Sequence, residues 1–189
     1  MTNLSKVMNL KYVSRTGWML RGVPNALAET VASHTFEVSL IALIIAEEVS
    51  NSCGKVDVEK ILKMSLIHDI PEAVMGDVVK WVKSRLGKDI ESLELEALSE
   101  LGLSKYAPLI TELNKGESLE ALIVKLADYT STTLQSLKYL KAGYVEVKEI
   151  SENNVKAIKE LLSKDALKPC KEVLIKTLIN LGLEDLSKS

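Results

Sequence analysis

Apolar residues recur at helical spacing along most of this chain, and no segment alternates apolar and polar residues over the length of a strand. Residues 37–49 are apolar on almost every side, which is typical of a helix at the centre of a bundle. Asp57 is a favourable N-cap for a second helix, and the apolar residues expected on one face of that helix are Val58, Ile61, Leu62 and Leu66. The pattern predicts an all-α fold.

The same periodicity predicts further helices downstream. They cover residues 91–101, 117–140, 155–162 and 169–181. No repeat, low-complexity tract or long linker divides the 189 residues, and a chain of this length can bury one full-sized core. We therefore predict one domain over residues 1–189, with its C-terminal helices in residues 145–185.

The charge balance argues against a nucleic-acid partner. The formal net charge is -2, so the chain has no surplus of Lys and Arg to displace counterions from a phosphate backbone. The apolar run at residues 40–46 is too short to cross a bilayer, and the N-terminal residues lack the pattern of a secretory signal. Cys53 and Cys170 have no CxxC neighbour, so neither a disulfide framework nor a thiolate metal site is predicted. We expect a cytoplasmic protein without a membrane partner.

The segment MSLIHDIPEAVMGDVV, residues 64–79, ends an apolar helix with an unusual group of ionisable side chains. Pro71 should stop the helix near His68 and Asp69, and Glu72 and Asp77 follow within ten residues of the histidine. Side chains at a helix end can converge in a way that neighbours within a helix cannot. A structural alternative is a histidine that complements the helix dipole.

Two further polar residues interrupt apolar helices. His34 begins the most apolar helix of the chain, and Asp128 lies within ALIVKLADYTSTTL. Each has a structural alternative, since a core histidine can bond a carbonyl and Asp128 can pair with Lys125. The exceptions are better explained together, as two imidazoles and two carboxylates around one divalent ion. Such a mixed N/O set suits Mn²⁺, Fe²⁺, Co²⁺, Ni²⁺ or Zn²⁺, with Mg²⁺ as a further candidate.

The order His34, His68-Asp69, Asp128 resembles the H…HD…D signature of the HD-domain metal-dependent phosphohydrolases. Four blocks are similar to the YfbR-like 5′-deoxynucleotidase branch of that superfamily. They are TGWMLRGV, SHTFEVSLIAL, LIHDIPEAVMGDVV and KLADYTSTTLQSLKYL. The similarity covers roughly residues 14–140 and implies a single HD-domain helical bundle with a metal site in its core.

The resemblance assigns a role to each residue of the signature. His34, His68, Asp69 and Asp128 would bind one divalent metal ion, since dinuclear members of the superfamily need histidines that this chain lacks. Glu72 matches the carboxylate that activates water, and Asp77 matches a second carboxylate near the sugar or the leaving oxygen. The structural alternatives are a solvated carboxylate for Glu72 and an N-cap of residues 78–83 for Asp77.

Substrate contacts are less closely fixed by the resemblance. Arg15 and Arg21 flank Trp18 in RTGWMLRGV, whereas some relatives place the arginine directly before the tryptophan, where this chain has Gly17. Either arginine could bind the phosphate, because a guanidinium matches phosphate oxygens in pairs. Lys125, one turn before Asp128, could reach the phosphate or pair with Asp128. Trp18 could contact a base or a sugar, or could pack in the core.

The resemblance implies a metal-dependent hydrolysis of 2′-deoxyribonucleoside 5′-monophosphates to deoxynucleoside and phosphate, by a homodimer. Fold and metal do not by themselves fix the substrate, so another nucleotide or small phosphoester is an alternative. A non-catalytic regulatory HD module that binds metal or nucleotide, and an interaction protein with structural His and Asp residues, are alternatives of a different class. A water-activating carboxylate at Glu72 favours the enzyme.

Overall fold

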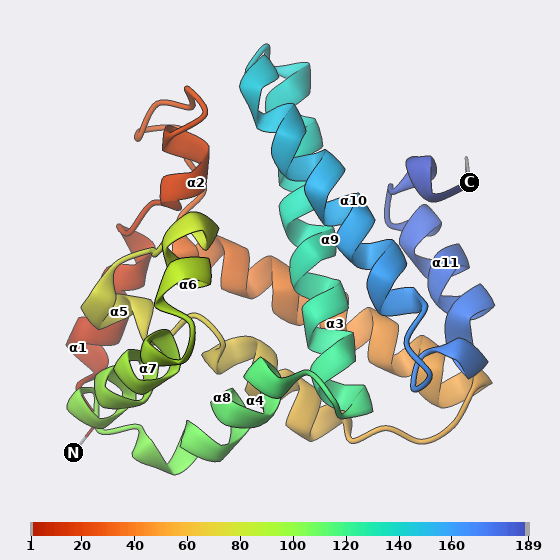
Figure 1. The fold of residues 1–189 in the computed structure, drawn as a ribbon, viewed down its shortest axis with the longest axis horizontal. Helices are drawn as coiled ribbons and strands as arrows, with labels where there is room; N and C mark the ends of the chain where they lie inside the picture. Colours follow the sequence, from red (N-terminus) through yellow and green to blue (C-terminus); the bar gives the residue numbers. More distant parts are fainter. Residues whose placement is uncertain (1, 188–189) are drawn as a thin grey trace.

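Two long crossing helices organise the fold. α3 (Val31–Ser52) and α9 (Leu119–Lys141) pack against each other, and α4 (Val58–Ile67) contacts both. α10 (Lys148–Leu162) runs alongside α9, and α11 (Lys171–Asn180) packs on α3 (Figure 1). The computed structural model describes residues 2–187. Within that range every named element is a helix, apart from one isolated antiparallel bridge between Ser14 and Thr30, so the all-α prediction is confirmed.

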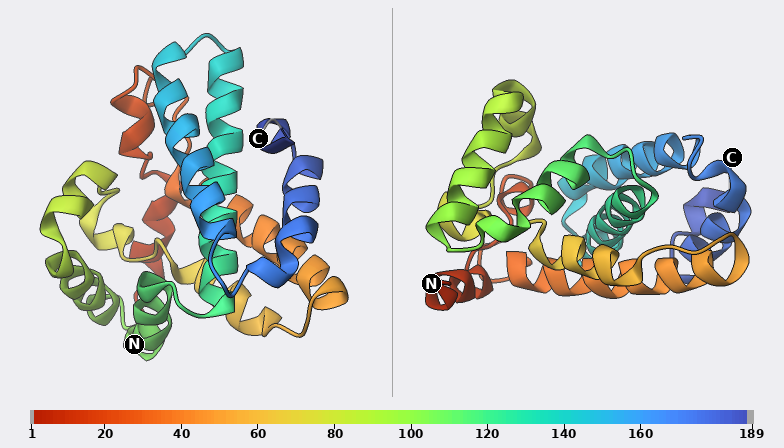
Figure 2. Two further views of the ribbon diagram at one scale, coloured as in Figure 1. Left: turned by 45° about the vertical axis from the view of Figure 1, so that its right-hand side comes forward. Right: turned by 90° about the horizontal axis from the view of Figure 1, so that it is seen from below.

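The shorter helices lie on the side of the fold away from α11, and most of them surround the N-terminal end of α3 (Figure 2). They are α1 (Leu4–Val7), α2 (Thr16–Met19), α5 (Glu72–Met75), α6 (Lys80–Leu86), α7 (Lys88–Glu100) and α8 (Ala107–Lys115). Short 3-10 turns connect or precede several helices, at Met8–Lys11, Ser104–Tyr106, Val145–Val147, Lys168–Cys170 and Glu184–Ser187. No helix of the described residues combines the length and the apolar character that crossing a membrane requires.

Local sequence explains where the central helices begin. The side chains of Thr30, Asp57 and Ser118 each accept a hydrogen bond from a backbone N–H in the first turn, which caps α3, α4 and α9. Pro71 then separates α4 from α5, as predicted, because a proline ring cannot continue the helix that precedes it. α4 therefore ends at the HD dipeptide. The side chains of His68 and Asp69 are then not held at the regular spacing of a continuous helix.

Some boundaries and faces differ from the sequence prediction. Leu66 is 53% exposed, and the buried residues of α4 are Ile61, Met64, Ser65 and Ile67. Because Ser65 is polar, the apolar pattern did not predict that it faces inward. Its hydroxyl donates to the Leu62 carbonyl oxygen. α10 starts at Lys148 rather than at residue 155. The apolar pattern missed its first half because the residues buried there, Ser151 and Asn154, are polar. α8 was not predicted, and α6 begins at Lys80, two residues after the start of the helix considered at residues 78–83.

The main core lies between α3, α4, α9, α10 and α11 and is largely aliphatic. Polar side chains are buried within it mainly on one stretch of α9, and these are Thr130, Ser131, Thr132, Thr133 and Ser136. Thr130 and Thr133 donate to backbone carbonyls one turn earlier. Ser131 instead points across to α3, where His34 is completely buried. The polar exceptions of the two central helices therefore meet at their crossing.

Candidate metal centre

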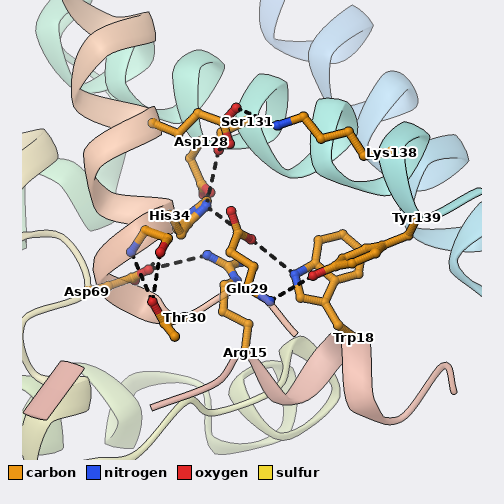
Figure 3. Close-up of polar contacts among 12 residues, drawn as sticks. Arg15, Trp18, Glu29, Thr30, His34, Asp69, Asp128, Ser131, Lys138 and Tyr139 are labelled. Carbon is orange, nitrogen blue, oxygen red and sulfur yellow. Dashed lines mark hydrogen bonds and ion pairs between the residues drawn. The ribbon is translucent and has the colours of Figure 1, made fainter. Parts of the chain in front are cut away.

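Three separate stretches of the chain bring the four predicted ligands together. His34 lies in the first turn of α3, His68 is the C-cap residue of α4, Asp69 follows it, and Asp128 lies in the middle of α9. One ligand atom from each of His34, His68 and Asp128 lies within 4.8 Å of the others. Figure 3 shows His34, Asp69 and Asp128 converging from separate segments. Residues distant in sequence thus form one cluster.

The distances suit a shared cation. His34 Nε2 lies 3.0 Å from Asp128 Oδ1, and His68 Nε2 lies 3.0 Å from Asp69 Oδ2. Asp69 Oδ2 is also 3.9 Å from His34 Nε2. Two ligands that bind one transition metal at about 2.1 Å, at angles near 90°, lie roughly 3 Å apart. The two imidazole rings, with centroids 5.5 Å apart, therefore stand at the separation that a common ion needs.

The hydrogen bonds of His68 leave one ring nitrogen for a ligand. His68 Nδ1 lies 2.7 Å from the Ser65 carbonyl oxygen, and a carbonyl only accepts, so Nδ1 carries the proton. His68 Nε2 is buried and makes no well-aligned hydrogen bond, although Asp69 Oδ2 lies 3.0 Å away. A neutral imidazole with an outer N–H···O=C bond and a free inner nitrogen is the usual form of a metal-binding histidine. The residues present therefore fit a divalent metal ion.

His34 has the same arrangement through different partners. Its Nδ1 lies 3.3 Å from Ser131 Oγ, and that hydroxyl donates in turn to Glu37 Oε2 at 3.2 Å. Because the hydroxyl proton is directed to Glu37, the serine oxygen accepts from His34 Nδ1. A second carboxylate, Glu29, has Oε2 at 3.9 Å from the same nitrogen (Figure 3). These contacts orient His34 so that Nε2 faces Asp128.

Charge at the centre is concentrated and partly balanced. Burial alone would raise the pKa of Asp128, but the hydrogen bond and charge of His34, with His68 and Arg15, lower it to about 2. The pKa of Asp69 is likewise held well below its usual range, against burial, by His68 and Arg15. Burial would lower the pKa of His68, but Asp69 outweighs it and raises that pKa to about 9. Without a metal, a proton on His68 supplies positive charge that a bound cation would otherwise supply.

Glu72 lies beside the two ligands at the end of α4. It shares a cavity of about 10 Å³ with His68, Asp69 and Lys83, and that volume is about what one water molecule requires. Glu72 Oε1 accepts from Lys83 Nζ at 3.2 Å, and its buried Oε2 has no hydrogen-bond partner. Burial first, and then the charge of Asp69, raise the pKa of Glu72 to about 8 despite Lys83. A carboxylate in this environment is well suited to accept a proton.

Comparison with known proteins agrees with this geometry. The HD domain profile matches residues 7–168 of the chain. A 5′-deoxynucleotidase of Erwinia tasmaniensis is 32% identical over 146 residues, which cover 71% of each protein. This chain belongs to the HD domain phosphohydrolase family.

Further relatives extend the comparison. The 5′-deoxynucleotidase YfbR of Salmonella arizonae is 30% identical over 150 residues, or 74% of this HD domain protein and 73% of the relative. The solved structure of a conserved hypothetical protein from Pyrococcus furiosus is 32% identical, with a TM-score of 0.79, and covers 92% of this chain and 96% of that one. An HD-domain phosphohydrolase from Listeria innocua, 18% identical with a TM-score of 0.60, shares the fold.

Arg15 and Asp77 lie next to the HD motif but have different partners. Arg15 Nη1 is 3.6 Å from Asp69 Oδ2, so the guanidinium borders the metal ligands. Its pKa is raised because the charges of Asp69 and Asp128 outweigh burial. Asp77 Oδ2 accepts from the Thr16 backbone N–H at 2.6 Å, which caps α2. The alternative that Asp77 caps the helix after it is wrong, since the N-cap of α6 is Val79.

Neither Trp18 nor Arg21 lines the cavities that border His68 and Asp69. The indole of Trp18 is 2% exposed, packs edge-on against Tyr139 and donates from Nε1 to Glu29 Oε2 at 3.1 Å. Because the ring is buried, a direct contact with a substrate would require the residues that cover it to move. Arg21 pairs with Glu149 at 3.0 Å, at the start of α10.

A second, larger cavity also borders the predicted metal ligands. It has a volume of about 380 Å³, and His68, Asp69 and Asp128 form part of its wall. Three lysines, Lys83, Lys88 and Lys125, also line it. Lys125 Nζ donates to the Asn114 carbonyl oxygen at 3.0 Å rather than pairing with Asp128. The sequence analysis did not predict that Lys83 and Lys88 line this cavity. The sequences of α6 and α7 do not indicate which of their lysines faces the metal centre.

The metal-free HD domain should lose stability as the pH rises. The pKa of His68 is raised from 6.5 to about 9, so its contribution is fully present below about pH 6.5 and is lost as the pH rises through about 9. The raised pKa of Glu72 acts in the same direction between about 4.5 and 8. We expect the melting temperature of chelator-treated protein to fall by several degrees between pH 6.5 and 9. A constant or rising melting temperature would contradict these charge states.

Ser131→Ala should weaken metal binding without disturbing the core. Outer hydrogen bonds to a histidine ligand are worth roughly 10–100-fold in metal affinity. We expect a loss of that size in a competition titration with a coloured chelator. Ser136→Ala is the matched control, because this serine is also buried on α9 but donates to the Val147 carbonyl at 2.9 Å. Equal affinities for the two variants would show that Ser131 does not orient His34.

Proposed function

We propose that this HD domain phosphohydrolase is a metal-dependent 5′-deoxynucleotidase, which cleaves 2′-deoxyribonucleoside 5′-monophosphates to deoxynucleoside and phosphate. The observation that carries the proposal is the meeting of two imidazoles, each with Nε2 facing a carboxylate of the cluster, next to the buried carboxylate of Glu72. A purely structural cluster has no use for an unpaired buried carboxylate oxygen, which costs free energy.

His34, His68, Asp69 and Asp128 would hold the divalent ion. When bound, such an ion lowers the pKa of water and neutralises charge on a phosphate oxygen. Glu72 would take a proton from the water through Oε2, the oxygen that Lys83 leaves free. Lys83 keeps Glu72 in place through Oε1, and its pKa is raised, against burial, by Asp69 and Glu72, so it stays charged.

The substrate phosphate needs positive charge next to the ligands. Arg15 borders Asp69 on one side, and Lys83, Lys88 and Lys125 line the 380 Å³ cavity on the other. A phosphomonoester carries a double negative charge near neutral pH, so these cations favour it over a neutral ligand. We propose Arg15 and Lys125 as phosphate contacts. Trp18 and Arg21 would contact the nucleoside only after a movement of residues 16–23.

Substrate identity comes from the relatives. The curated proteins of Erwinia tasmaniensis and Salmonella arizonae, both named as 5′-deoxynucleotidases, share about 30% of their residues with this chain. That relationship supports a nucleotide substrate and favours the deoxyribose form. A homodimer remains a prediction from the sequence resemblance, and a cytoplasmic location remains a prediction from the lack of a secretory pattern or a membrane-spanning run in the sequence.

Phosphate release from a nucleotide panel tests the proposal. Protein stripped with chelator is reloaded separately with Mn²⁺, Co²⁺, Mg²⁺ or Zn²⁺ and offered 5′- and 3′-monophosphates of deoxyribo- and ribonucleosides. We expect release from 5′-deoxyribonucleotides with at least one metal, and none from 3′-monophosphates or from stripped protein. Metal binding without any release would instead indicate a regulatory HD module.

A further inference from the structure

Two cysteines far apart in the sequence lie together at the end of the fold remote from the metal centre. Cys53 is the C-cap residue of α3, and Cys170 ends the 3-10 turn that leads into α11. α11 packs against α3, and the views of Figures 1 and 2 both show the start of α11 beside the C-terminal end of α3. Both thiols are free, and both pack in the main core cluster.

The two thiols interact, and solvent reaches them unequally. Cys170 is 4% exposed, whereas Cys53 is only partly buried. Burial and a hydrogen bond with the Cys53 thiol raise the pKa of Cys170 to about 12. Because Cys53 is the more exposed thiol, a reagent from solvent meets it first. Cys170 is buried and keeps its proton at neutral pH, so the group it can attack is one formed on the neighbouring Cys53.

We propose that Cys53 and Cys170 form a reversible disulfide that ties α3 to α11, with a low-molecular-weight disulfide as the oxidant. The Cys53 thiolate attacks one sulfur of the oxidant and expels the other as a thiolate, which leaves a mixed disulfide on Cys53. Cys170 loses its proton, attacks the Cys53 sulfur and expels the second thiolate. Two protein S–H bonds are replaced by one S–S bond, and the oxidant is reduced to two thiols that take up the two protons.

The bond should act on stability rather than on catalysis. It would close a loop that contains α4 to α10, and cross-links that close long loops restrict the unfolded chain most. We expect the melting temperature of the oxidised protein to rise by roughly 5–15 °C, from typical disulfide contributions in a domain of this size. His34 lies at the opposite end of α3, about 28 Å away along a straight helix. The inference does not depend on the proposed function.

Intact mass and thermal unfolding test the proposal on the full chain. Folded protein is incubated with oxidised glutathione, quenched in acid and weighed, and its peptides are mapped. We expect a mass lower by two hydrogen atoms, no retained glutathione, a peptide pair joined through Cys53 and Cys170, and the rise in melting temperature given above. A reducing agent should restore the original mass, separate the two peptides and abolish the rise in melting temperature.

Two variants serve as controls. Cys170→Ala should keep one glutathione on Cys53 and gain no stability, because the second attack is removed. Cys53→Ser should stay unmodified, because Cys170 alone is buried. The proposal is overturned if the wild-type protein stays reduced, accumulates the glutathione adduct with Cys170 still free, forms linked dimers, or closes the disulfide without a rise in melting temperature.

Discussion

Replacing His68 with alanine is expected to lower the rate of phosphate release by a factor on the order of 10³ or more, while the protein stays folded. The imidazole offers Nε2 to the metal, and no other side chain among the described residues stands at that position. Loss of a ligand removes the ion that stabilises developing negative charge, which is worth several kcal/mol, or about tenfold in rate for each 1.4 kcal/mol. Initial rates at saturating metal and substrate would measure the loss.

The fold of this variant should be checked separately. His68 is the C-cap residue of α4 and lies at the very end of the helix, so the circular dichroism spectrum should match that of the metal-free wild type. Lys63→Ala is a suitable control, because Lys63 lies on the same helix and pairs only with the exposed Glu59. It should keep full activity. Wild-type turnover in the His68→Ala variant, with metal still bound, would mean that the reaction occurs elsewhere.

Glu72→Gln should keep the metal and lose most of the rate. Glutamine has the same shape and can still contact Lys83, but it cannot accept a proton from water. General-base catalysis typically contributes roughly 10²–10⁴-fold, so we expect kcat to fall within that range while KM and metal affinity change little. The measurement is a steady-state comparison together with a metal titration of the same samples.

The pH dependence gives this variant a second readout. The pKa of Glu72 is about 8 in the metal-free protein, and the positive charge of a bound ion would bring it down. The wild-type rate should therefore fall on the acidic side of a pH at or below about 8, and Glu72→Gln should lack that fall. Glu59→Gln, at an exposed carboxylate, is the control. A Glu72→Gln rate close to that of wild type would remove Glu72 from the reaction.

The metal cluster was predictable because its residues violate the pattern around them. His34 and Asp128 stand out in helices that are otherwise apolar, and burying such groups singly is costly, so their joint presence indicated a shared partner. The break at Pro71 likewise followed from local chemistry. Both observations depend on residues that are close in sequence or on the composition of one helix.

Other features depend on which helix faces which, and sequence periodicity does not contain that information. Glu29 and Lys83 lie in short segments of ordinary composition, and only the tertiary fold brings them to His34 and Glu72. The hydrogen bond that Asp77 accepts from the Thr16 backbone N–H spans 61 positions and was not predicted. The pairing of Cys53 with Cys170 is another contact between distant segments.

An anomalous diffraction map of a crystal soaked in Mn²⁺ would test the proposed metal site most directly. The prediction is a single strong peak at about 2.0–2.3 Å from His34 Nε2, His68 Nε2 and one oxygen each of Asp69 and Asp128. The peak should vanish in crystals of His68→Ala. A map without density between the two imidazoles, or with the ion bound elsewhere, would contradict a metal-dependent reaction at this site.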